Sequence, residues 1–118
     1  MASRTRQDIA EAYLEAWRDK DFDAIRASLH DDVAFNGPFV SLSSTDDVIN
    51  AITQLSGLVK TPENQNVMTG SYDVCIIYDL VPVNGTPSVA MPEVHTVTGE
   101  KVSSIRVIFD TAALTAIF

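Results

Sequence analysis

The chain has a single cysteine, Cys75, among 118 residues, so it cannot form a disulfide within itself. Basic residues are also few, with eight Lys and Arg against sixteen Asp and Glu, and the net charge is −8. They are scattered along the sequence and provide no basic face for nucleic acid or for an anionic membrane surface. We therefore expect neither nucleic acid nor a membrane as a partner.

Long hydrophobic runs are missing as well. No apolar stretch approaches the ~20 residues that span a bilayer, and residues 1–8 lack the apolar core of a signal peptide. Cys75 lies in a short apolar run and is expected to be a small buried side chain. The two histidines are far apart and form no metal motif. These absences predict a cytoplasmic protein without a metal or a cofactor.

The composition that is present is that of a globular protein. Apolar residues make up 46% of the chain and charged residues 20%, an ordinary balance for a folded domain. A chain of 118 residues is long enough for a hydrophobic core and short enough for one domain. No repeat, low-complexity segment or linker divides it. We therefore predict a single domain over residues 1–118.

The first part of the chain shows helical periodicity. Between Thr5 and Asp19, apolar residues recur every three or four positions and place Tyr13 and Trp17 on one buried face. Thr5 and Asp8 have the spacing of a helix N-cap arrangement. The segment therefore predicts an amphipathic helix that turns a tyrosine and a tryptophan inward.

Two further helices and a short strand are expected next. Asp21 can cap a helix that Asp31–Asp32 break, and His30 near its end is expected to face the negative end of the helix dipole. Val33–Phe35 then forms a short strand, and residues 44–62 contain a third helix ended by a proline. Helices therefore occupy the N-terminal half of the chain.

The C-terminal half has the pattern of strands. The strand-like runs are residues 66–68, 72–83, 88–97 and 101–110. Asn84–Gly85 is a strong hairpin signal, and Thr98–Glu100 is a second tight turn. Helices first and a meandering sheet afterwards predict an α+β domain. In the expected architecture, a curved antiparallel sheet wraps around three N-terminal helices as a cone and encloses a pocket.

Pairing across the Asn84–Gly85 turn assigns strand residues to faces. Val83 pairs with Thr86 through a two-residue loop or with Ser88 through a four-residue loop, and both give the same alternation. One face is then aromatic and aliphatic, with one acid and one histidine. Its members are Tyr72, Val74, Ile76, Tyr78, Leu80, Val89, Met91, Glu93, His95 and Val97.

The opposite face is more apolar than a sheet surface exposed to solvent. Its members are Asp73, Cys75, Ile77, Asp79, Val81, Ala90, Val94 and Thr96, of which five are apolar. An apolar outer face predicts a subunit interface, most simply that of a symmetric homodimer. The alternative is that helices or the apolar tail, residues 112–118, cover it.

Several segments carry a resemblance to a known family. They are Tyr13–Trp17, Asp21–Ile25, His30–Phe35, Gly99–Val102 and Ile105–Asp110. In order and spacing these segments resemble the nuclear transport factor 2-like superfamily, in particular its SnoaL-like branch. The resemblance covers nearly the whole chain and implies the cone-shaped fold with a pocket. It implies no single activity, because the superfamily includes ketosteroid isomerases, polyketide cyclases, epoxide hydrolases and transport factors.

The ketosteroid isomerases give the sharpest comparison. Tyr13 matches their oxyanion-hole tyrosine on the first helix, and Glu93 matches their second oxyanion donor, an acid kept protonated by an apolar site. Their general base is an aspartate before a proline, and here that position is Gly37, before Pro38. Because glycine cannot accept a proton, classical steroid isomerisation is not expected.

Two other branches of the superfamily differ in their chemistry. The epoxide hydrolases activate water with two aspartates and an arginine, but Arg106 and Asp79 are predicted to face away from the pocket. The SnoaL-like cyclases use an acid–base residue in a hydrophobic pocket for an aldol closure. Glu93 or His95 could fill that role here.

The resemblance and the face assignment together define a candidate site. Tyr13 is the expected donor to a ligand carbonyl, and Glu93 and His95 are the expected acid–base pair. The predicted ligand-binding residues are Trp17, Phe35, Tyr78, Met91, Ile105, Val107 and Phe109. Each has a plainer alternative: Tyr13 and His95 as core residues, Trp17 as packing, Glu93 reaching water at the pocket mouth.

Two functions remain open from the sequence. One is a cofactor-independent isomerase, cyclase or hydratase that acts on a small hydrophobic carbonyl compound. The alternative, which the glycine at position 37 motivates, is a non-catalytic ligand-binding module or a dimeric scaffold with a filled cavity. They differ in whether a proton-transfer residue reaches the pocket, and only Glu93 and His95 qualify.

Overall fold

The computed structural model describes residues 5–116 as four helices and six strands. The helices are α1 (Arg6–Arg18), α2 (Phe22–Ser28), α3 (Thr45–Ser56) and α4 (Thr111–Thr115). The strands are β1 (Leu29–Asn36), β2 (Ser41–Leu42), β3 (Glu63–Thr69), β4 (Asp73–Leu80), β5 (Val89–Thr98) and β6 (Lys101–Val107). None of the helices in this range is long and apolar enough to cross a membrane.

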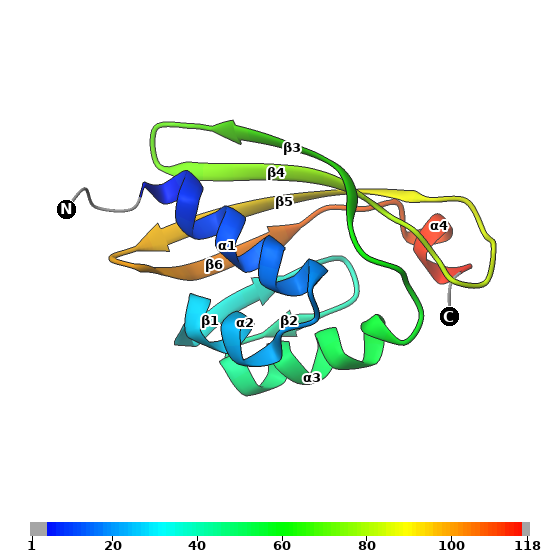
Figure 1. Cartoon of the computed structure of the whole chain (residues 1–118), viewed down its shortest axis with the longest axis horizontal. Helices are drawn as coiled ribbons and strands as arrows, with labels where there is room; N and C mark the ends of the chain where they lie inside the picture. The colour runs from blue at the N-terminus through cyan, green and yellow to red at the C-terminus, as the bar shows by residue number, and fades with distance from the viewer. Residues whose placement is uncertain (1–4, 117–118) are drawn as a thin grey trace.

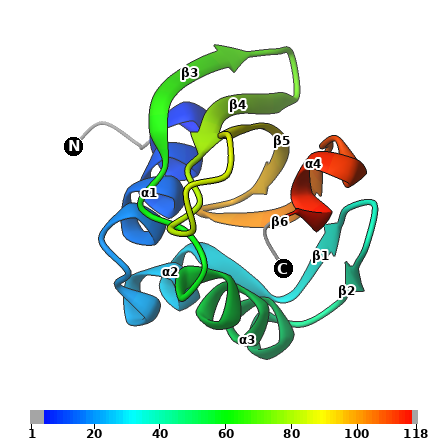
Figure 2. The same cartoon turned by 90° about the vertical axis from the view of Figure 1, so that its right-hand side faces the viewer.

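The six strands form one curved sheet in the order β2-β1-β6-β5-β4-β3. Figure 1 shows α1 lying across the sheet, and Figure 2 shows the strands as an arc with α1 and α3 on its inner side. The predicted α+β class and curved sheet around three N-terminal helices are confirmed. The sheet is mixed, however, because β1 runs parallel to β6. No hairpin joins these two strands, so the turn signals could not fix their relative direction.

Local signals account for the start of α1. The Thr5 hydroxyl accepts a hydrogen bond from the Asp8 amide at 3.0 Å, and the Asp8 carboxylate accepts one from the Thr5 amide at 3.0 Å. This reciprocal capping box satisfies two amides that have no partner within the helix. The helix buries Tyr13 and Trp17 as its periodicity predicts.

The β4–β5 hairpin has the predicted register. Leu80 pairs with Val89 and Val74 pairs with His95, which is the alternation set by a two-residue loop at Asn84–Gly85. The ladder ends at Leu80, earlier than predicted, and residues 81–88 leave the sheet. The alternation therefore places Tyr78, Met91, Glu93 and His95 on one face, where all four are buried.

The first strand is longer than the sequence pattern indicates. It begins at Leu29, so that His30 and the two aspartates after it lie in β1 instead of at a helix end. The His30 ring nitrogen Nε2 lies 2.8 Å from the Thr98 carbonyl oxygen, and the Thr45 hydroxyl donates to the His30 carbonyl at 2.6 Å. The expected dipole contact of His30 is therefore wrong. Pairing with β6, which is distant in sequence, extends the strand.

The chain after the last strand forms the short helix α4. The Asp110 carboxylate caps it by accepting hydrogen bonds from the amides of Ala112 and Ala113. Leu114 is buried, so α4 packs its apolar side against the body of the domain. The predicted tail over residues 112–118 lies partly outside the described residues.

Candidate functional site

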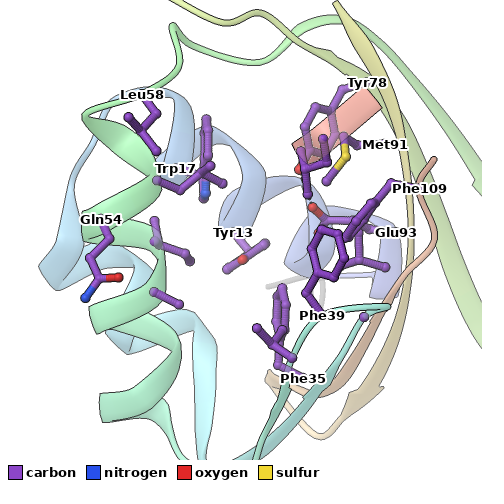
Figure 3. Close-up of a pocket in the computed structure, with 17 residues that line it drawn as sticks. Tyr13, Trp17, Phe35, Phe39, Gln54, Leu58, Tyr78, Met91, Glu93 and Phe109 are labelled. Carbon is purple, nitrogen blue, oxygen red and sulfur yellow. Dashed lines mark hydrogen bonds between the residues drawn. The ribbon is translucent and has the colours of Figure 1, made fainter. Parts of the chain in front are cut away.

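A cavity of about 350 Å³ lies between α1, α3 and the concave face of the sheet (Figure 3). Six of the eight aromatic residues within residues 5–116 line it. They are Tyr13, Trp17, Phe35, Phe39, Tyr78 and Phe109. The polar groups of the lining are few, and Glu93 is the sole carboxylate among the lining residues described. The cavity is therefore an apolar space with one acid in its wall.

Most of the residues predicted for the site line this cavity. Those that do so are Tyr13, Trp17, Phe35, Tyr78, Met91, Glu93, Val107 and Phe109. His95 and Ile105 do not reach the cavity surface, because both are fully buried behind its wall. His95 can therefore act on a ligand only through a neighbouring side chain.

The structure adds lining residues that the sequence analysis did not assign to the site. They are Gly37, Phe39, Val40, Ala51, Ile52, Gln54, Leu55, Leu58 and Leu114. The apolar stripe of α3 was a usable signal for Ile52 and Leu55. Phe39 and Val40 lie in the connection between β1 and β2, and Leu114 lies in α4, where no periodicity marks the inward direction.

Glu93 is held by two side chains of the sheet. The Tyr78 hydroxyl donates a hydrogen bond to Glu93 Oε2, and His95 Nε2 lies 3.0 Å from Glu93 Oε1. Glu93 is buried, with only 5% of its surface exposed, and it lines the cavity. Strand pairing explains this cluster, since Tyr78 is on β4 and Glu93 and His95 alternate on β5. The sheet therefore fixes the carboxylate in the cavity wall.

His95 contacts Glu93 through one of its two ring nitrogens. Its Nδ1 is buried and has no hydrogen-bond partner among residues 5–116, while Nε2 lies 3.0 Å from Glu93 Oε1. A proton on Nε2 is donated to the carboxylate, so His95 helps to orient Glu93 in the cavity wall.

Tyr13 brings a hydroxyl to the same cavity from α1. Its ring meets the His95 ring edge-on, with centroids 5.3 Å apart, and no residue that the structure describes is hydrogen-bonded to its hydroxyl. Burial raises the pKa of Tyr13 well above its usual value of 10.0, and the negative charge of Glu93 raises that pKa further. Tyr13 therefore remains a hydrogen-bond donor that a ligand can use.

Tyr78 is likewise kept protonated. Its pKa is raised well above 10.0, first by burial, then by the charge of Glu93 and by the hydrogen bond to that carboxylate, with a further contribution from Tyr13. Both tyrosines thus stay neutral at physiological pH. A protonated Tyr78 satisfies one oxygen of Glu93 and orients the carboxylate.

Gly37 leaves the position of the isomerase base without a side chain. A Cβ built there would lie 3.6 Å from the Phe109 ring and 3.7 Å from the Val107 carbonyl oxygen, which are ordinary contacts. The neighbouring Asn36 accepts a hydrogen bond from the Ser41 hydroxyl at 2.9 Å and is not part of the lining. A proton acceptor at this site must therefore come from Glu93.

The remaining charged and metal-ligating groups are elsewhere. Arg106, which the epoxide hydrolase comparison concerned, borders a separate polar hollow with Asn36 and Ser104. Within residues 5–116 no three His, Cys, Asp or Glu side chains are grouped closely enough to bind a metal ion. The chemistry available at the cavity is that of two tyrosines and a carboxylate.

No family model and no curated protein matches the sequence. Solved structures do match along nearly the whole chain. An NTF2-like protein of unknown function from Cytophaga hutchinsonii is 23% identical, with a TM-score of 0.82 over 98% of this chain and 99% of that protein. A protein provisionally assigned as a polyketide cyclase from Pseudomonas putida is 12% identical, with a TM-score of 0.83 over 97% and 98%.

A third similar structure has a different activity in its name. It is an LEH-like epoxide hydrolase from M. tuberculosis, which is 20% identical, with a TM-score of 0.76 over 95% of this chain and 87% of that protein. The chain therefore has the nuclear transport factor 2-like fold, as the sequence resemblance predicts. Because proteins with this fold carry different activities, function has to be argued from the cavity.

Proposed function

We propose that the protein catalyses proton transfer on a small hydrophobic carbonyl compound without a cofactor, as an isomerase or a cyclase does. One observation carries the proposal: the Glu93 carboxylate lies in the wall of an apolar cavity that the Tyr13 hydroxyl also lines. A proton acceptor and a hydrogen-bond donor in a water-poor space are the two groups that enolisation requires.

The proposed step balances with these residues alone. The carbonyl oxygen accepts a hydrogen bond from Tyr13, and Glu93 takes a proton from the carbon next to the carbonyl. The electron pair of the broken C–H bond forms the enolate, whose oxygen charge Tyr13 stabilises. Return of the proton to another carbon completes an isomerisation. In a cyclisation the enolate carbon attacks a second carbonyl carbon and closes a ring, and the alkoxide oxygen that forms takes the proton back from Glu93. Tyr78 and His95 orient the carboxylate throughout.

The residues that line the cavity favour removal of a proton from a carbon next to a carbonyl over hydrolysis of an epoxide. Among the described residues, the cavity wall contains no arginine and one carboxylate, so the cluster of two aspartates and an arginine has no counterpart there. The similarity to a provisionally assigned polyketide cyclase agrees with this choice. The name of the M. tuberculosis structure supports hydrolysis instead, but only through the shared fold.

Deuterium exchange in D₂O tests the proposal without knowledge of the product. Wild-type protein is incubated with a panel of cyclic and aromatic ketones, and incorporation of deuterium next to the carbonyl is followed by mass spectrometry. We expect catalysed exchange for at least one ketone and a loss of about 10²–10³-fold in Tyr13→Phe. Tyr72→Phe, which changes a tyrosine that is 80% exposed, is the matched control.

The second candidate function is a ligand-binding module. Gly37 favours it, because the base position of the isomerases carries no side chain. For this function, ketones shift the melting temperature of the protein while deuterium exchange stays at the background rate. That pair of results would contradict the catalytic proposal.

A further inference from the structure

We propose that the cavity selects an apolar ligand carrying a protonated amine, and that Glu93 binds the ammonium group. The inference shares Glu93 with the proposed function, but it concerns binding and needs no carbonyl. It specifies that the ligand is positively charged, whereas the proposed function specifies only that the ligand is a small hydrophobic carbonyl compound.

The first argument is the charge balance around Glu93. Its two hydrogen-bond partners are the Tyr78 hydroxyl and His95 Nε2, and His95 is buried behind the cavity wall, so neither places a cation in the cavity itself. Across the described part of the chain, no Lys, Arg or His side chain lines the cavity. Buried carboxylates are normally paired with a cation because desolvation makes an isolated charge costly. Here a cationic ligand would provide that pairing.

The second argument is the free hydrogen-bonding capacity of the carboxylate. An ionised carboxylate has about four acceptor positions, and the structure occupies two of them, one on each oxygen. Glu93 is part of the cavity lining, so a ligand nitrogen can approach the remaining positions. Figure 3 shows Glu93 on the side of Met91 and Phe109, with Trp17 and Gln54 across the cavity.

The third argument is the aromatic wall. Six aromatic rings line the space, and ring faces attract cations. Trp17 and Tyr78 lie side by side in this wall, with ring centroids 6.4 Å apart. The net charge of −8 also raises the local concentration of cations and lowers that of anions. A carboxylate ligand would meet repulsion from Glu93, so the cavity discriminates between ligand charges.

The proposed roles of Tyr13 and Glu93 together describe the ligand as an apolar amino ketone. Its carbonyl oxygen would accept from Tyr13, and its ammonium group would lie against Glu93. The carbonyl half of this description rests on the proposed function, whereas the ammonium half rests on the position of Glu93 in an aromatic cavity wall without a cationic side chain among the described residues.

The test compares three probes that differ in charge and share a phenylpropyl body: 3-phenylpropylamine, 3-phenylpropan-1-ol and 3-phenylpropanoate. Trp17, the one tryptophan of the chain, reports binding by its fluorescence, and calorimetry gives the dissociation constants. We expect the amine to bind at least about tenfold more tightly than the alcohol, the effect of one charge-assisted hydrogen bond. The carboxylate is expected to bind most weakly.

Two variants test whether Glu93 is responsible for the preference for the amine. Glu93→Gln should bring the amine to the affinity of the alcohol, while Asp32→Asn, which removes an exposed acid, should keep the preference. If Glu93→Gln does not fold, the ordering of the three probes on wild-type protein still decides. Equal affinities, a tighter carboxylate or no binding of the amine would overturn the inference. Because none of the probes is a ketone, these results are independent of the deuterium-exchange outcome.

Discussion

Glu93 is buried because the alternation of β5 leaves it no other face. Its neighbours on that face, Met91 and His95, are buried as well, and the strand is paired on both sides. A carboxylate in this position needs donors, and Tyr78 and His95 supply one each. The three side chains therefore act as a unit, and replacing one changes the surroundings of the others.

Tyr78→Phe tests this unit through stability. The substitution removes a hydroxyl that donates to a buried carboxylate, and hydrogen bonds to charged groups contribute about 1.5–3 kcal/mol. We expect the free energy of unfolding in urea to fall by about 2 kcal/mol and the deuterium exchange to slow. Tyr72→Phe should change neither. An unchanged stability in Tyr78→Phe would contradict the hydrogen bond to Glu93.

The raised pKa values of Tyr13 and Tyr78 predict how stability depends on alkaline pH. The unfolded chain loses these protons near pH 10.0, whereas the folded protein keeps them to higher pH. Above pH 10.0 the unfolded state therefore binds fewer protons, and the free energy of unfolding falls as pH rises.

Urea denaturation at several pH values between neutral and strongly alkaline measures this slope. Tyr13→Phe and Tyr78→Phe should each make the slope shallower, and Tyr72→Phe, which keeps both buried hydroxyls, should retain it. A slope that does not change in either buried variant would show that these tyrosines ionise alike in the folded and unfolded states.

The sequence predicts which residues line the cavity where a regular element carries them. Helical spacing places Tyr13 and Trp17, and strand alternation places Tyr78, Met91 and Glu93, because one buried position fixes its neighbours. Phe39 and Leu114 were missed, since a loop and a short helix have no such alternation. Nor does alternation distinguish a residue in the cavity wall from His95, which lies behind it.

At the scale of elements, the sequence correctly predicted those features that depend on residues close together in the chain. The capping box of α1 and the register of the β4–β5 hairpin involve residues that are close in sequence, and the structure has both. The parallel pairing of β1 with β6 joins opposite ends of the chain. No turn connects these two strands directly, so the local signals in the sequence do not indicate that direction.

A carboxylate introduced at position 37, just after β1, tests whether a second base can act in the cavity. Gly37 is not at a positive φ angle, unlike Gly85 and Gly99, and a Cβ there makes ordinary contacts. Gly37→Asp should therefore fold and add a carboxylate to the cavity wall. In a Glu93→Gln background we expect it to restore part of the deuterium exchange, with Gly37→Ala as the control. Equal exchange in the two double variants would contradict a shared cavity.

At the scale of the molecule, a homodimer formed through the outer face of the sheet remains a prediction. Val94 pairs with Cys75 there and both are partly buried, while Met68 on β3 and Ile108, just after β6, are about half exposed. Sedimentation should give twice the mass of the chain, and Val94→Asp, which places a charge on this face, should give the monomer. A wild-type monomer at high micromolar concentration would contradict the interface.

The proposed catalysis by this protein depends on Glu93 accepting the proton in an otherwise apolar cavity. Its most direct test is the rate of deuterium exchange for the best ketone of the panel, measured for wild-type protein and for Glu93→Gln, with ketone affinity measured in parallel. The account predicts a loss of about 10²–10⁴-fold in Glu93→Gln, because a carboxamide cannot serve as a general base. A folded Glu93→Gln variant that binds the ketone and exchanges at the wild-type rate would contradict it.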